Sequence, residues 1–153
     1  MGRKDEAQMW NQSKSLRLSE IWIKAALICW LILAISLPFI LKYGCQLMSS
    51  EFGLPLLIFY IFSIPLCLVF WCLNRLLVNI KSGAIFVADN VKELRLISWS
   101  CFWGGLILLA ASFWDLQLIL LSGIMGFFGL LMRVMKNVFS EAIAIKEEND
   151  FTV

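Results

Sequence analysis

The sequence predicts an all-α fold, a polytopic membrane protein built as a bundle of four transmembrane helices, and three observations lead to this prediction. Hydrophobic residues make up 61% of the 153 residues and charged residues only 16%, whereas a soluble domain is about 45–50% apolar and about 25% charged. The mean hydropathy is +0.84. Four stretches carry no charged side chain and approach or exceed the roughly 20 residues that a spanning helix needs. They are residues 25–41, 52–74, 96–114 and 116–132.

These stretches divide the chain into a single membrane domain, residues 1–153. We expect transmembrane helices at about residues 21–42, 53–77, 94–114 and 116–138, followed by a tail at 139–153. The first span follows some twenty mostly polar residues and lacks a small-residue cleavage site, which favours a retained helix over a signal peptide. Pro65 predicts a kink near the middle of the second span.

The lysines and arginines predict the orientation. Basic residues in short loops tend to stay on the cytoplasmic side of a membrane. Of the 13 basic residues, all except Lys42 precede or open the first span, lie between the second and third spans, or follow the fourth. Both termini are therefore predicted to be cytoplasmic (N-in/C-in), and the chain is predicted to be a multi-pass protein of the cell membrane.

The third and fourth spans are separated by so few residues that they must form an antiparallel hairpin. Asp115 lies in this turn and is expected to cap the start of the fourth span. Gly123, Gly126 and Gly129 recur at three-residue spacing in that span. Because small residues let membrane helices approach closely, we expect tight packing here, with Gly126 in close contact with its neighbour.

The chemistry-bearing residues are few. The chain has no histidine, which removes the commonest general base and metal ligand. Its five cysteines form no C-x-x-C pair, and all except Cys45 lie in apolar runs, as buried small hydrophobes do. The mid-membrane hydroxyls of Ser36, Ser63 and Ser122 are each expected to bond to their own helix. No catalytic residue, cofactor or metal site is predicted, and an enzyme is not expected.

The segment before the third span turns amphipathic after a flexible Ser-Gly break. Phe86, Asn90, Leu94 and Ile97 follow one another at helical spacing and are expected to share one face of a helix that leads into the span. Two interpretations stay open. The face packs on neighbouring helix ends, or it forms a docking surface for a partner, together with Arg95.

The chain after the fourth span keeps its apolar pattern and predicts a cytoplasmic helical extension of the fourth helix. It ends in an acidic segment that is either solvated and disordered or able to bind a basic partner. The candidate partner-binding residues of the two segments are Phe86, Asn90, Leu94, Arg95, Glu147, Glu148, Asn149 and Asp150.

In these two segments the sequence resembles a bacterial family of small membrane proteins, the domain-of-unknown-function 2975 family. The resemblance rests on Gly83-x-x-Phe86-x-x-x-Asn90-x-x-x-Leu94-Arg95 and on the terminal residues 147–153. In that family a serine or threonine commonly follows the phenylalanine and can cap the helix. Val87 stands there in this chain and has no capping hydroxyl.

The resemblance implies a bacterial cytoplasmic membrane protein without an agreed biochemical activity. Members resemble proteins commonly encoded beside a small helix-turn-helix regulator of the Xre or Cro type. This suggests that the chain binds or sequesters such a regulator at its cytoplasmic face, with the lipid bilayer as its surroundings and without binding nucleic acid directly. The alternative is a small transporter, channel or immunity-type protein acting within the bilayer. Association into homo-oligomers through glycine or alanine faces also stays open.

Overall fold

A computed structural model describes the backbone of residues 2–44 and 53–151 and the side chains of residues 14–40 and 53–149. Within these ranges the chain forms four helices and no strand, namely α1 (Gly2–Gly44), α2 (Gly53–Lys81), α3 (Ala88–Ala111) and α4 (Leu118–Phe151). Each is long and apolar enough to cross a membrane. The predicted all-α, four-helix membrane fold is therefore confirmed. The expectations for Cys45 and for the side chains of Lys42 and Asp150 fall outside the described residues.

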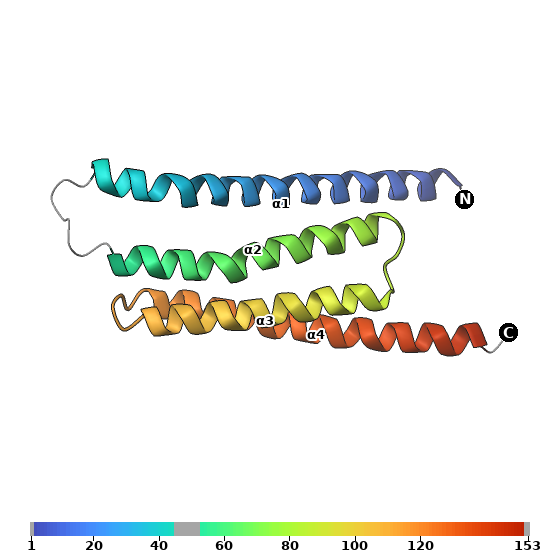
Figure 1. The fold of residues 1–153 in the computed structure, drawn as a ribbon. Coiled ribbons are helices and arrows are strands. Elements are labelled where there is room, and N and C mark those ends of the chain that lie inside the picture. The colour runs from blue at the N-terminus through green and yellow to red at the C-terminus, as the bar shows by residue number, and fades with distance from the viewer. Residues whose placement is uncertain (1, 45–52, 152–153) are drawn as a thin grey trace.

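The helices run antiparallel in chain order (Figure 1). The two chain ends and the α2–α3 loop lie at one end of the molecule, called here the terminal end, and the α3–α4 turn lies at the other, the turn end. Among the described residues, each helix closely approaches only its neighbours in sequence. The part of α4 nearest the C-terminus projects beyond the α2–α3 loop, as the predicted helical extension requires (Figure 1).

Two reciprocal serine–glycine contacts join α3 to α4. Ser98 Oγ donates to the carbonyl of Gly129 at 2.8 Å, and Ser122 Oγ donates to the carbonyl of Gly105 at 2.8 Å. Serine and glycine are seven residues apart on each helix (98 to 105, 122 to 129), so the two bonds lie about two turns apart along the antiparallel pair. Hydrogen bonds between membrane helices contribute about 0.6 kcal/mol each, and the glycines let the two backbones come close enough to form them.

The prediction that a side chain at Gly126 would enter a close helix contact is wrong. A Cβ added to Gly126 would meet no heavy atom within 4 Å, whereas one added to Gly129 would lie 3.3 Å from the Ser98 carbonyl oxygen. The reason is geometric. With 3.6 residues per turn, each three-residue step rotates the side-chain direction by about 60°. Glycines at this spacing therefore spread around α4, and of these three only Gly129 has its Cβ direction pointing at α3.

The serine expectations are confirmed in part. Ser36 and Ser63 donate to carbonyls of their own helices, those of Leu33 at 3.2 Å and Phe59 at 2.8 Å. The prediction for Ser122 is wrong, because its hydroxyl bonds across the interface to α3 instead. The facing residue on α3 is a glycine, so no side chain shields that carbonyl from α4.

A small core between α2 and α3 holds the middle of the molecule together. Cys72, Ile97 and Cys101 are buried there, and partly buried apolar residues of α2 and α4 pack around them. Helix α2 continues through Pro65, which is itself buried, and changes direction about its middle, in agreement with the predicted kink (Figure 1). The four described cysteines are free thiols.

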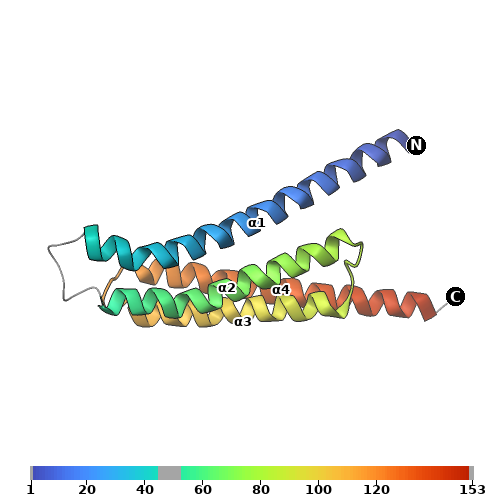
Figure 2. The same ribbon diagram turned by 45° about the horizontal axis from the view of Figure 1, so that its top comes forward.

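Helix α1 is attached to α2 alone among the described residues. Trp30 Nε1 donates to Ser63 Oγ at 3.2 Å, and its ring stacks on Phe59 with centroids 5.0 Å apart. Tyr60 adds a bond from its hydroxyl to a carbonyl of α1. Toward the terminal end α1 diverges from the other helices (Figure 2). There Glu20 still accepts a hydrogen bond from Lys81 of α2 at 3.0 Å.

The predicted cap at the start of α4 is confirmed. The Gln117 backbone N–H donates to Asp115 Oδ1 at 3.1 Å, and the Leu118 N–H donates to the Asp115 carbonyl at 3.0 Å. These bonds satisfy backbone donors that the first turn of a helix leaves without partners. Asp115 thus fixes the point at which the chain reverses into the α3–α4 hairpin.

Candidate functional site

The α2–α3 loop at the terminal end is held by a single buried side chain, Asn90. Its Nδ2 group donates to the carbonyls of Ala84 at 2.8 Å and Ile85 at 2.7 Å, and its Oδ1 accepts from Asn79 Nδ2 at 2.8 Å. Asn90 is 0% exposed, so these bonds satisfy groups that burial would otherwise leave unpaired. Gly83 supplies the one positive φ angle of the described chain, 82°, at the start of the loop.

Helix α3 starts without a side-chain cap. Val87 occupies the N-cap position and makes no side-chain hydrogen bond to the helix, as the missing hydroxyl predicts. Asn90 fixes the loop from inside the first turn, because its side-chain amide donates to two loop carbonyls. The loop is therefore fixed to the start of α3 by Asn90 rather than by a capping residue.

The expected helix face of Asn90, Leu94 and Ile97 exists and points inward. All three residues are buried. For these three, the structure therefore agrees with the packing interpretation. Phe86 precedes α3 and is 45% exposed, with its ring 5.9 Å from that of Phe139 on α4. Arg95 is exposed on α3. Only Phe86 and Arg95 of this candidate set are accessible to a partner.

A buried carboxylate that sequence reasoning missed lies beside this loop. Glu93 is 5% exposed and forms an ion pair with Arg75 of α2. Arg75 Nη1 and Glu93 Oε1 are 3.1 Å apart. The neighbouring Asn74 Oδ1 is buried without a hydrogen-bond partner. The signal was present in the sequence, because Glu93 follows Asn90 by three residues and so falls on the same inward face of α3.

The acidic end of the chain is helical. Glu147, Glu148 and Asn149 are exposed on α4, which continues to Phe151. Phe86 of the first candidate segment contacts Phe139 at the start of the second. Glu147 lies eight residues further along α4 (139 to 147), about 12 Å beyond that contact at 1.5 Å per residue. The acidic residues and the α2–α3 loop therefore form two separate surfaces at the terminal end.

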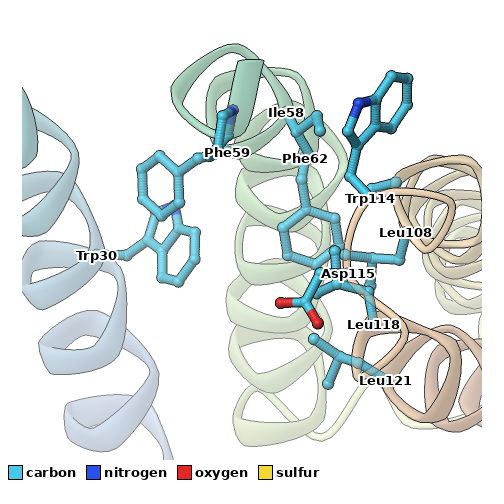
Figure 3. A pocket seen from close by; sticks show the side chains of 11 residues that line it. Trp30, Ile58, Phe59, Phe62, Leu108, Trp114, Asp115, Leu118 and Leu121 are labelled. Atoms are coloured by element: carbon cyan, nitrogen blue, oxygen red, sulfur yellow. The ribbon is translucent and has the colours of Figure 1, made fainter. Parts of the chain in front are cut away.

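A largely apolar cavity of about 380 Å³ lies at the turn end. Figure 3 shows Trp30 of α1 and Phe59 and Phe62 of α2 on one side, with Leu108 and Leu121 on the other. Asp115 is the ionisable residue in the lining, and its carboxylate already caps α4. A cavity with this lining can hold an apolar group, but it contains no paired acid and base for catalysis.

The comparison with protein families decides the identity of the chain. The model described as "Protein of unknown function (DUF2975)" matches residues 26–153. The chain belongs to the DUF2975 family. No curated protein and no solved structure matches it. Among the residues that the structure describes, no group of three His, Cys, Asp or Glu side chains could hold a metal ion.

Three residues of the motif through which the sequence resembles DUF2975 proteins have structural roles in this member. Gly83 provides the positive φ angle, Asn90 binds the loop carbonyls, and Leu94 is buried in the helix interface. The DUF2975 match also includes the projecting end of α4. The N-terminal part of α1, before residue 26, lies outside the match.

Proposed function

We propose that this DUF2975 protein is a non-enzymatic membrane protein that binds a small helix-turn-helix DNA-binding regulator at its cytoplasmic face. The observation that carries the proposal is the projecting end of α4, which presents an ordered surface beyond the α2–α3 loop. The distribution of basic residues supports placing this terminal end in the cytoplasm.

The projecting part of α4 has a face suited to a basic protein. Val138, Glu141, Ile145 and Glu148 follow one another at spacings of three, four and three residues, so they lie along one side of the helix. All four are exposed. Apolar and acidic groups alternate along this line, which we name the α4 outer face. Its apolar residues can bury against a partner, and the carboxylate of Glu141 can pair with a basic side chain that otherwise binds a DNA phosphate.

The polar groups inside the bilayer support a binding role over transport. The hydroxyls of Ser63, Ser98 and Ser122 all donate within or between helices. A hydrated path requires polar groups that are available to the solute. The cavity at the turn end is largely apolar and lies between Trp30 and the α3–α4 turn.

Affinity capture of the full-length protein in detergent, with a small helix-turn-helix regulator of the Xre or Cro type as the probe, tests the proposal. Ile145→Lys on the α4 outer face should abolish capture, whereas Ser140→Lys should retain it, because this exposed residue points about 140° away from Ile145. Removal of residues 147–153 should also weaken capture. The proposal is refuted if the regulator remains soluble and fully active on DNA whether or not the membrane protein is present.

A further inference from the structure

A cavity of about 250 Å³ lies between α3 and α4 toward the terminal end, and three cationic side chains line it. Arg95 comes from α3, and Arg133 and Lys136 come from α4. Ser98 and Trp99 complete the lining. We name this cavity the basic pocket. None of these residues belongs to the α4 outer face or to the α2–α3 loop.

The helix geometry gathers these charges. The Ser98–Gly129 hydrogen bond brings α3 and α4 into close approach at the floor of the pocket. Arg95 lies three residues before Ser98, and Arg133 lies four residues after Gly129, so both project from the same side of the contact, one turn nearer the terminal end. Two like charges held next to each other across a helix pair repel, and an anion between them removes this repulsion.

The basic pocket differs from the other basic positions of the terminal end. Four other cations in the described chain are paired with carboxylates, namely Lys24 and Lys81 with Glu20, Arg75 with Glu93, and Lys92 with Asp89. The structure records no ion pair or hydrogen bond for Arg95, Arg133 or Lys136 within the residues it describes. The basic pocket therefore holds three positive charges that no carboxylate of the described chain pairs with.

We infer that the basic pocket binds the phosphate of an anionic phospholipid. Arginine guanidinium groups bind phosphate oxygens through paired N–H donors, and lysine adds a point charge. The Ser98 hydroxyl already donates to Gly129, so the cations supply the contacts to the anion. Basic pockets between transmembrane helices are the usual form of anionic headgroup sites, and Trp99 is the residue type found at headgroup depth.

The surroundings favour a lipid over a soluble phosphate compound. One turn from Trp99 toward the turn end, Trp103 is 59% exposed on the same side of α3. On α4, Gly126 lies two turns below Arg133 and leaves open space where a side chain would stand. A phosphate held in the basic pocket therefore has an apolar wall directly beneath it, along which acyl chains can lie.

Native mass spectrometry of the purified full-length protein tests this inference without any regulator, so its outcome is independent of the proposed function. The probes are dioleoyl phosphatidylglycerol, dioleoyl phosphatidylcholine and inorganic phosphate. The anionic lipid should bind more tightly than the zwitterionic lipid with the same chains. In R95Q/R133Q its affinity should fall by about 30-fold, since each cation near an anionic lipid contributes about 1 kcal/mol.

Two control variants make the result specific. R95K/R133K keeps both charges and should retain the preference for phosphatidylglycerol. R17Q/K146Q removes two cations outside the basic pocket and should leave the affinity unchanged. Equal affinity for the two lipids, or an equal loss in R17Q/K146Q, would overturn the inference. Displacement of the lipid by inorganic phosphate at the same concentration would overturn the lipid assignment in favour of a soluble phosphate ligand.

Discussion

Substitution of Gly129 by leucine should strongly destabilise the α3–α4 pair, while the same substitution at Gly126 should be tolerated. A Cβ at Gly129 would stand 3.3 Å from the Ser98 carbonyl oxygen, 3.3 Å from the Phe102 ring and 3.4 Å from Cys101 Cβ. Two of these neighbours belong to or adjoin the backbone of α3 and cannot rotate away. The helices must therefore separate to admit even the first carbon of the new side chain.

The magnitude follows from two contributions. Overpacking of a close contact costs about 1–3 kcal/mol, and leucine brings three further carbons beyond Cβ, which places it at the upper end. Separation of the helices also breaks the 2.8 Å bond from Ser98 to Gly129, worth about 0.6 kcal/mol. Leucine recovers about 1 kcal/mol through its better helix propensity. The net loss for Gly129→Leu is about 2–3 kcal/mol, whereas Gly126→Leu has no clash to offset its gain in propensity.

Equilibrium unfolding in mixed micelles, followed by tryptophan fluorescence while the fraction of denaturing detergent is raised, measures both variants. Gly129→Leu should unfold at a markedly lower detergent fraction than the wild type, and Gly126→Leu at the same fraction or a higher one. If the two variants lose equal stability, or if Gly126→Leu loses more, then the close approach is not centred on Gly129 and the reasoning fails.

Three further predictions concern the polar contacts. Asn90→Ala should lower the free energy of unfolding by about 2–4 kcal/mol, because three hydrogen bonds disappear, and hydrogen exchange should show faster exchange in the α2–α3 loop. In micelle unfolding, Arg75→Gln should lower the free energy of unfolding more than Glu93→Gln does, by about 1–3 kcal/mol. The reason is that loss of Arg75 leaves the buried Glu93 carboxylate charged and unpaired. The opposite order would contradict the assignment of Glu93 as the buried partner. Trp30→Ala should increase the distance between spin labels on α1 and α2, whereas a phenylalanine there should keep the stack on Phe59 and the wild-type distance.

The helices and the hairpin could be predicted because they depend on the sequence locally. Charge-free runs of membrane-spanning length need no partner to be recognised, and Asp115 marks a turn too short for anything except an antiparallel pair. The cap that this residue forms and the bend at Pro65 follow from the properties of single residues. Local rules were sufficient for all of these features.

The interfaces could not be predicted because they depend on which residues face each other. Gly126 and Gly129 have the same residue type and nearly the same surroundings in the sequence, yet only at Gly129 would a Cβ meet α3. The reciprocal bonds of Ser98 and Ser122 require the register between two helices, which no single segment contains. A signal in the sequence could have identified this register. On each helix of the hairpin, a serine and a glycine are seven residues apart.

The candidate site shows the same division. Periodicity correctly placed Asn90, Leu94 and Ile97 on one face, but it does not state whether a face points toward a neighbouring helix or toward solvent. Burial decided that question. The gathering of Arg95 with Arg133 and Lys136 is also a product of the antiparallel register, since these residues are almost forty positions apart in the chain.

The sequential pairing of the helices has a consequence for biosynthesis. Because α1 meets only α2, α2 meets α3 and α3 meets α4 in the described chain, the surface that each helix needs is already in the membrane when that helix leaves the ribosome. During assembly, each helix needs only the helix before it and the helix after it to complete its contacts. Contacts between close neighbours along a chain form quickly and leave little time for misassembly. A chain interrupted after α2 would thus expose the α2 surface around Cys72 that α3 covers, and one interrupted after α3 would expose the glycine face that α4 covers.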